Sequence, residues 1–213
     1  MVKETIDDYY SLRFLQRYLI GHKGYIAGGC FKNIFNNEAV KDLDIFFYNA
    51  DDYAEAERYF DERTAGYGFE GEKVSREDAE YIFVYENDNC KSYKDKKTGV
   101  RLELCRSIHG TPEAVIGQFD FTITKFALYL KTDETDTGFE IVRHEDFFKH
   151  LHLKRLVIDD TLPYPMSTLE RSYRYAKYGY YPCRESKLKL AIAIHRLNED
   201  ELRVGRSLYE GVD

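Results

Sequence analysis

Residues 25–47, YIAGGCFKNIFNNEAVKDLDIFF, constrain the fold of this chain more than any other stretch. YIA predicts a short strand that runs into a turn at Gly28 and Gly29, and FKNIFNN predicts one or two helical turns. DLDIFF alternates acidic and apolar positions before its two phenylalanines, which predicts a second strand. Side chains at positions i and i+2 of a strand point to the same face, so we expect Asp42 and Asp44 side by side.

Two adjacent carboxylates at the edge of an apolar run are unfavourable unless a positive charge lies between them. A divalent cation is the common solution, and Mg²⁺ fits because it takes hard oxygen ligands and leaves positions open for phosphate oxygens. At Gly28 and Gly29, backbone N–H groups can approach a triphosphate with no Cβ in the way. The two features together predict nucleotidyl transfer from an NTP by a two-metal mechanism, with two Mg²⁺ ions.

That mechanism needs a third carboxylate on a neighbouring strand. Glu103, between two leucines in RLELC, is the first candidate, and Asp120, in QFDFT, is the alternative. Each residue has another interpretation. Glu103 could instead pair with an Arg or Lys on a neighbouring strand, and Asp120 could instead bind a backbone group, a lysine or the nucleotide. For the glycines the alternative is a turn without a ligand, and for Asp42 and Asp44 it is a turn cap and a solvent-facing acid.

The pattern AGGCFKN…KDLDIFF resembles the signature of the nucleotidyltransferase superfamily typified by DNA polymerase β. It also partly resembles the head domain of CCA-adding enzymes and bacterial poly(A) polymerases, in which Arg-Asp soon follows the glycines; here Lys32 and Asn33 stand in that region. The layout GTPEAVIGQFDFTITKFAL followed by TLERSYRYAKYGYYP is similar to small nucleotidyltransferase-like proteins of bacteriophages. The resemblance covers residues 23–180 in outline and 26–47 specifically.

The resemblance implies a mixed, mostly antiparallel sheet flanked by helices, dependence on magnesium and use of nucleoside triphosphates. Gly28 and Gly29 match the phosphate-binding turn, Asp42 and Asp44 the metal-binding pair, and Glu103 the third acid. The activity so implied is template-independent transfer of a nucleoside monophosphate to an acceptor hydroxyl, first of all an RNA or tRNA 3′ end. The alternative is a catalytically inactive phage protein that binds a nucleotide or a host factor.

Charge is distributed unevenly along the chain. The formal net charge is −7, which argues against a surface devoted to nucleic acid, but residues 149–196 hold ten Lys and Arg against four Asp and Glu. Within them Arg171, Arg174 and Lys177 recur at spacings of three, with Tyr175 and Tyr178 alongside. This pattern predicts a helical face that grips a triphosphate or RNA and stacks a base. A solvated helix whose tyrosines pack on the core is the alternative. Lys32, just after the glycines, is a further phosphate candidate.

The remaining patterns predict an α+β fold with a C-terminal helical subdomain, divided as residues 1–162 and 163–213. The expected strands lie over 81–87, 100–106 and 119–131, the last with a far end that could be helical, and a polar hairpin-like loop is expected over 87–99. The expected helices lie over 5–20, over 51–68 closed by Gly66 and Gly68, from Thr111, over 167–181 and over 184–202, and 144–158 is expected to be a helix or an irregular connection.

Composition favours a cytoplasmic protein, in the host cytoplasm if a phage encodes it. No stretch reaches the roughly 20 apolar residues that span a bilayer, and the first residues do not resemble a secretory signal. The four cysteines lack metal-site or disulfide-framework spacing, so reduced, mostly buried thiols are expected.

Overall fold

The computed structural model of the protein describes residues 1–66, 74–132, 137–159 and 162–200. They form two compact units, each of which takes two separate pieces of the chain. Unit 1 comprises Met1–Ile116 and Phe126–Arg143, and unit 2 comprises Gly117–Lys125 and, of the described residues, 144–200. The division expected at residue 163 falls inside unit 2 and stays a prediction about domains.

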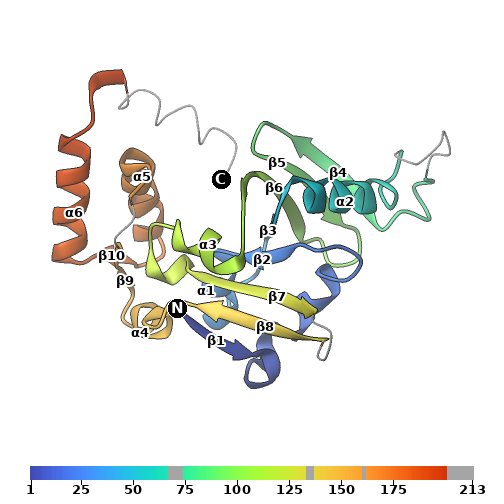
Figure 1. The fold of residues 1–213 in the computed structure, drawn as a ribbon, viewed down its shortest axis with the longest axis horizontal. Coiled ribbons are helices and arrows are strands. Elements are labelled where there is room, and N and C mark those ends of the chain that lie inside the picture. Colours follow the sequence, from blue (N-terminus) through green and yellow to red (C-terminus); the bar gives the residue numbers. More distant parts are fainter. Residues whose placement is uncertain (67–73, 133–136, 160–161, 201–213) are drawn as a thin grey trace. The chain divides into compact units, whose positions relative to one another are not determined.

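Unit 1 is built on an eight-stranded mixed sheet, with strands in the order β1-β8-β7-β2-β3-β6-β5-β4 (Figure 1). The strands are β1 (Val2–Thr5), β2 (Tyr25–Ala27), β3 (Asp42–Phe47), β4 (Tyr81–Glu86), β5 (Cys90–Asp95), β6 (Arg101–His109), β7 (Phe126–Thr132) and β8 (Thr137–Arg143). In the described part of this sheet β3 and β6 are the one parallel pair of neighbouring strands. The predicted α+β fold with a mixed sheet flanked by helices is confirmed.

The N-terminal segment differs from the predicted helix over 5–20. It forms the edge strand β1 and then two 3₁₀-helices, η1 (Ile6–Asp8) and η2 (Tyr10–Tyr18). Leu12, Leu15 and Tyr18 are the buried residues of η2, and their spacing of three matches the three residues per turn of a 3₁₀-helix. The amphipathic pattern was therefore helical, but with the shorter period.

The prediction of a polar hairpin-like loop over 87–99 is wrong, because Cys90–Asp95 forms strand β5 between β4 and β6. Its polar side chains have partners that allow burial: Lys91 Nζ lies 2.8 Å from Asp61 Oδ2, and Tyr93 donates a 2.7 Å hydrogen bond to Asp61 Oδ1. Both contacts reach helix α2 (Ala50–Asp61), so their formation depends on tertiary packing that local polarity does not reveal.

The strand predicted over 119–131 is correct only in its second half. Thr122–Thr124 is a short 3₁₀-helix, η3, and the strand β7 begins at Phe126. The Thr124 hydroxyl donates a 2.8 Å hydrogen bond to the Phe121 carbonyl, a local bond that competes with strand pairing. Strands β1 and β8 were not predicted.

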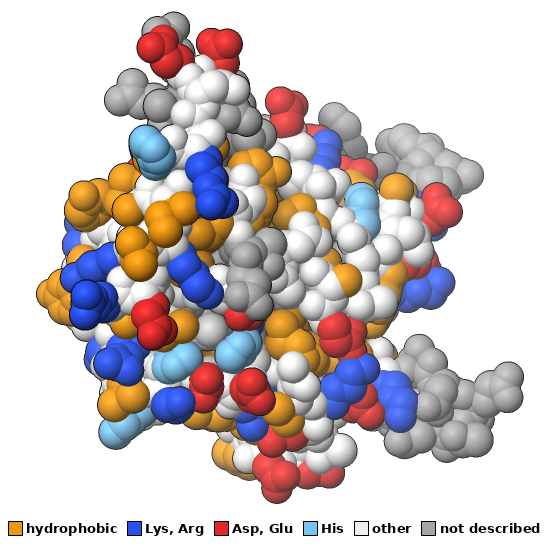
Figure 2. All heavy atoms as spheres, turned by 60° about the vertical axis from the view of Figure 1, so that its left-hand side comes forward, with side chains coloured by type: hydrophobic (Ala, Val, Ile, Leu, Met, Phe, Trp, Pro, Cys, Tyr) orange, Lys and Arg blue, Asp and Glu red, His pale blue; other side chains and the backbone are white. Residues whose placement is uncertain are grey.

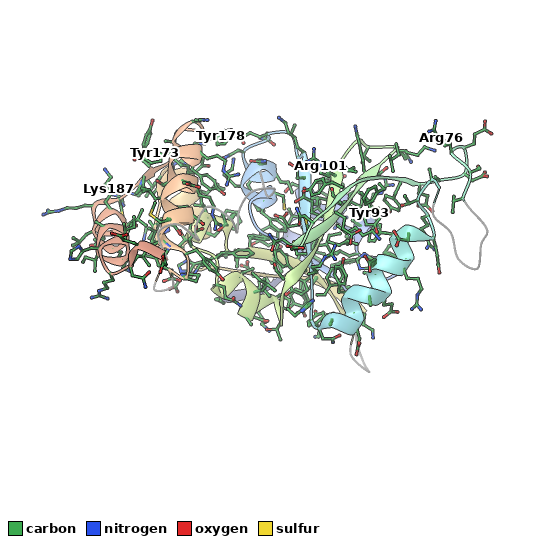
Figure 3. The ribbon with its side chains drawn as sticks, turned by 90° about the horizontal axis from the view of Figure 1, so that it is seen from above. Arg76, Tyr93, Arg101, Tyr173, Tyr178 and Lys187 are labelled. Atoms are coloured by element: carbon green, nitrogen blue, oxygen red, sulfur yellow. The ribbon has the colours of Figure 1, made fainter. Side chains whose placement is uncertain are left out.

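Three helices flank the sheet of unit 1: α1 (Cys30–Phe35), α2 (Ala50–Asp61) and α3 (Pro112–Gly117). The Asn49 side chain caps α2 by accepting a 2.9 Å hydrogen bond from the Asp52 amide. The ring of Phe60 stacks on Tyr93, with ring centroids 5.3 Å apart. Helix α2 therefore covers the face of the sheet that carries Lys91 and Tyr93 (Figure 3). Gly68, expected to help close this helix, lies outside the described residues.

Unit 2 combines η3 with α4 (Phe147–His152), α5 (Pro165–Ala176), α6 (Arg184–His195) and a short parallel pair, β9 (Arg155–Leu156) and β10 (Tyr181–Pro182). The two predicted C-terminal helices are present, and Pro165 begins α5 in keeping with the preference of proline for the first helical turn. Helix α6 ends at His195 rather than at 202. The face turned forward in Figure 2 carries Lys and Arg side chains interspersed with hydrophobic ones.

The four cysteines are free in the structure, and Cys30 and Cys90 are buried whereas Cys105 and Cys183 are half-buried, so the expectation of mostly buried thiols is met at two positions. None of the described helices combines the length and the apolar character needed to cross a membrane.

Candidate active site

The central feature of unit 1 is the parallel pair β3–β6, which aligns the predicted acidic residues. Asp44 is the register partner of Glu103, and Asp42 is the register partner of Arg101. Because side chains alternate along a strand, these four residues share one face of the sheet, and it is the face opposite Lys91 and Tyr93. The expectation that Glu103 stands beside the aspartate pair on a neighbouring strand is thus met by the register.

Asp44 has the most perturbed environment of these carboxyl groups. Burial, together with repulsion from Glu103 and then Asp42, raises the pKa of Asp44 to about 7. Within the described part of the chain, the Asp44 carboxylate makes no hydrogen bond or ion pair. A half-buried carboxylate without a partner is unfavourable when ionised, so this position favours a cation or a proton.

Glu103 is 5% exposed and is held by a neighbour from β4. The hydroxyl of Tyr85 donates a 2.8 Å hydrogen bond to Glu103 Oε1. Burial raises the pKa of Glu103, and this hydrogen bond acts in the opposite direction because it favours the ionised carboxylate. Tyr85 therefore both orients Glu103 and limits how strongly burial favours its protonated form.

Arg101 bridges two of the three acids. Its Nε lies 3.4 Å from Asp42 Oδ1, and its Nη1 lies 3.8 Å from Glu103 Oε1. Its side chain is 38% exposed. Figure 3 shows Arg101 and Tyr93, from neighbouring strands, on opposite sides of the sheet, with Tyr93 directed toward α2.

The chemistry of this face fits a divalent cation, although the side chains do not yet converge on one. Three carboxylates supply hard oxygen donors from adjacent strands, and Asp44 has no competing partner among the described residues. As the side chains stand, no three His, Cys, Asp or Glu groups in the described ranges are gathered closely enough to hold a metal ion. The guanidinium of Arg101 between Asp42 and Glu103 accounts for part of that arrangement.

The glycine pair follows β2 directly beside the acids, since Ala27 is the register partner of Asp44. Gly28 has a φ of +105°, a left-handed conformation that favours glycine, and its amide donates a 3.0 Å hydrogen bond to the Phe126 carbonyl. Gly29 stands at the N-cap of α1 with a φ of −69°. The turn is therefore where the sequence predicted it, but the Gly28 N–H already has a partner within the sheet.

Lys32 lies on α1 and is 5% exposed. Its Nζ is 3.0 Å from Glu38 Oε2, an ion pair whose acid is 41% exposed on its side chain. The structure thus gives the predicted phosphate ligand a carboxylate partner, which a phosphate would have to replace.

Asp120 belongs to unit 2 and is 3% exposed. Its Oδ2 lies 3.4 Å from Nε of Arg171, and its Oδ1 accepts a 2.9 Å hydrogen bond from the Phe121 amide. The first of the alternatives for Asp120, a bond to the backbone, is present. This ion pair joins the segment that precedes η3 to helix α5.

The other predicted nucleotide ligands also lie in unit 2. Arg174 is in the last turn of α5, Lys177 is its C-cap, and Tyr178 follows with 57% exposure. Tyr175, by contrast, packs edge-on against Phe121 with ring centroids 5.7 Å apart. This face therefore mixes core tyrosine with exposed basic and aromatic groups, and its binding to a nucleotide stays a prediction.

Two residues of the site were not predicted. Arg101 could have been found, because it stands two positions before Glu103 on a strand and therefore on the same face. Tyr85 could not, because its contact with Glu103 depends on the pairing of β4, β5 and β6.

The mixed sheet and its flanking helices form a nucleotidyltransferase-like fold. Similar solved structures include a CCA-adding enzyme with CTP and a CCA-adding enzyme with ATP, each with 16% sequence identity and a TM-score of 0.60. The match covers 96% of this chain and 49% of the CTP-bound one, and 99% of this chain and 52% of the ATP-bound one. The Thermotoga maritima CCA-adding enzyme complexed with tRNA has 16% identity and a TM-score of 0.57, and the match covers 96% of this chain and 50% of that one. This chain spans about half the length of each. At such identity the likeness concerns the fold alone.

Residues 2–154 match the sequence model of the Gabija anti-defense 2 family protein, and the chain belongs to this family of phage proteins. A comparison with curated proteins found no similar sequence.

Proposed function

We propose that this protein is a metal-dependent, template-independent nucleotidyltransferase that moves a nucleoside monophosphate from an NTP to an acceptor hydroxyl, in the service of the anti-defence role that its family name describes. The observation that carries the proposal is the register of β3 and β6, which sets Asp44 beside Glu103 and next to the glycine turn. An RNA or tRNA 3′ end is the acceptor we propose first. Similar structures include a CCA-adding enzyme complexed with tRNA, and residues 149–196 carry a surplus of basic side chains.

In this proposal Asp42, Asp44 and Glu103 hold two Mg²⁺ ions, and Gly28, Gly29 and Lys32 contact the triphosphate. When bound, the ions would stabilise the charge that develops on the phosphate oxygens. Transfer forms a bond between the acceptor oxygen and the α-phosphorus and releases pyrophosphate, so the acceptor hydroxyl has to lose its proton. Glu103 is suited to orient or deprotonate that hydroxyl, because burial raises its pKa and Tyr85 fixes one of its oxygens.

The test is transfer of label from each of the four α-labelled NTPs to total tRNA in the presence of Mg²⁺. We expect the wild-type protein to label RNA, and Asp44→Asn to reduce labelling to background while the circular dichroism spectrum is unchanged. Asp51→Asn is the matched control, because it makes the same chemical change at an exposed position of α2. Equal labelling by Asp44→Asn and wild type would contradict the assignment.

A second candidate function is a non-catalytic phage protein that binds a nucleotide or a host factor. The ion pairs of Arg101 with Asp42 and Glu103, and of Lys32 with Glu38, favour it, since they engage predicted ligands with groups of the chain itself. Tight binding of an NTP with no transfer to any RNA, small molecule or protein hydroxyl would support this function instead.

A further inference from the structure

The arginine at the start of β6 occupies a place that the proposed metal site needs. Arg101 is in register with Asp42 on β3 and stands two residues before Glu103 on its own strand. Its guanidinium lies 3.4 Å from one carboxylate and 3.8 Å from the other. A single cationic side chain therefore bridges acids from the two parallel strands.

Little holds this side chain in place. Both distances exceed those of short charge-assisted hydrogen bonds, and the side chains of Arg101 and Asp42 are 38% and 42% exposed. An ion pair as exposed as that of Arg101 with Asp42 stabilises the protein little, and the contact with Glu103, whose side chain is 7% exposed, is the longer of the two. The backbone is secured separately, because the Arg101 amide donates a 2.9 Å hydrogen bond to the Lys41 carbonyl and the strand pairs on both sides. The guanidinium can thus leave without disturbing the sheet.

The same two carboxylates are also oxygen donors for a divalent cation. Asp44 is a neighbour of both, because it lies two residues after Asp42 on β3 and in register with Glu103 on β6. Asp44 makes no ion pair in the described part of the chain. A divalent ion would interact with all three acids, whereas the guanidinium reaches two. Two cations at one cluster repel each other, so binding of the ion and the Arg101 contacts oppose each other.

We propose that Arg101 is a displaceable counter-ion of the carboxylate site: its guanidinium holds Asp42 and Glu103 while no divalent cation is bound, and it has to leave them when one binds. This inference rests on the proposed function, because it assumes that the acids are metal ligands. Arg101 is accordingly a positioning residue that raises the Kd of the site for a divalent cation, because the ion has to displace its guanidinium.

A matched control exists on the same strand. Arg106 lies on the opposite face of β6, where its Nη2 pairs with Glu86 Oε1 at 2.7 Å and its guanidinium lies over the ring of Tyr53. Its side chain is 29% exposed, close to the value for Arg101. Arg106→Gln therefore removes the same charge from the same strand without touching the carboxylate site.

The experiment is a titration of the full chain with Mn²⁺, followed by the loss of the free-ion signal in electron paramagnetic resonance, at fixed ionic strength. We expect Arg101→Gln to lower the Kd for Mn²⁺ about two- to fivefold relative to wild type, the factor that corresponds to an exposed ion pair. Arg106→Gln should leave the Kd within about 1.5-fold, since it lies outside the site. Arg101→Lys, which keeps the charge but lacks the planar fork, should give an intermediate value and serves if Arg101→Gln does not fold.

The results separate the inference from the proposed function. If Arg101→Gln binds Mn²⁺ no more tightly than Arg106→Gln while Mg²⁺-dependent transfer persists, the counter-ion role is wrong and the transferase stands. Absence of Mn²⁺ binding in every variant would overturn both the metal site and the counter-ion role.

Discussion

Asp44 on β3 and Glu103 on β6 are register partners in a parallel strand pair, and Glu103 raises the electrostatic cost of ionising Asp44. Burial and this proximity raise the pKa of Asp44 to about 7. The site is therefore balanced between holding a proton and holding a cation. That balance makes several of its properties measurable without knowledge of the acceptor.

The first prediction concerns stability and pH in the absence of metal. Between about pH 4 and pH 7 the folded protein keeps a proton on Asp44 that the unfolded chain has released, so the contribution of Asp44 to the free energy of unfolding falls as pH rises through that window. Asp44→Asn removes this dependence. We expect the variant to match wild type near pH 4 and to exceed it by roughly 1–3 kcal/mol at pH 8. Urea unfolding with a chelator present measures this, with Asp51→Asn as control; a constant difference across pH would contradict it.

The second prediction concerns Tyr85. Tyr85→Phe removes the hydrogen bond that favours ionised Glu103, so the pKa of Glu103 should rise further. If Glu103 acts as a carboxylate, the acidic limb of the pH–rate profile for nucleotidyl transfer should move to higher pH, by about half a unit to one unit. The rate on the plateau at high pH should change little. An unshifted acidic limb would show that Glu103 does not limit the rate in its protonated form.

The third prediction compares the two glycines. Gly28 adopts a φ of +105°, whereas Gly29 has a φ of −69°. Gly28→Ala should therefore lower the free energy of unfolding by about 1–2 kcal/mol, the usual cost of a left-handed conformation for an L-residue. Gly29→Ala should cost clearly less, because alanine adopts its conformation readily. Urea midpoints of the two variants provide the comparison, and equal losses would argue against the backbone explanation.

The fourth prediction concerns the ion pair of Asp120 with Arg171 in unit 2. Asp120→Ala leaves the Arg171 guanidinium without its nearly buried carboxylate partner, and we expect a loss of about 1–3 kcal/mol in the free energy of unfolding. Arg171→Ala combined with Asp120→Ala should be less destabilising than the sum of the two single changes. Additive losses would mean that the two side chains contribute independently. Asp120→Asn, which can keep the bond from the Phe121 amide, separates the effect of charge from that of shape.

Local patterns were enough to predict most of this fold. The alternation in DLDIFF identified β3, and the turn at Gly28 and the helix start at Pro112 were read directly from residue preferences. Strand β5 could not be recognised in this way, because Lys91 and Tyr93 become compatible with burial only through Asp61 on another element. The interruption at Thr122–Thr124 likewise reflects side-chain bonds to the backbone that no periodicity shows.

The residues of the candidate site likewise include some that the sequence predicted and some that it did not. The acids and glycines were predicted because their spacing carries the chemistry, and the register then brought Asp44 and Glu103 together. The partners of predicted ligands were not foreseen: Glu38 for Lys32, Arg101 for Asp42 and Arg171 for Asp120. The two residues of such an ion pair are brought together by tertiary structure. Sequence spacing can indicate a pair only when its two residues are close in the sequence, as Lys32 and Glu38 are.

The chain passes between the two units three times, and this has a consequence for its biosynthesis. Residues 117–125 leave the ribosome before β7 and β8 of unit 1, and Arg171, the partner of Asp120, is translated about fifty residues after it. Nascent unit 2 therefore cannot close its Asp120–Arg171 contact until most of the polypeptide has been made. Ribosome stalling or truncation before α5 would leave Asp120 without Arg171, and we expect chains shortened in this way to be recognised by chaperones and proteases.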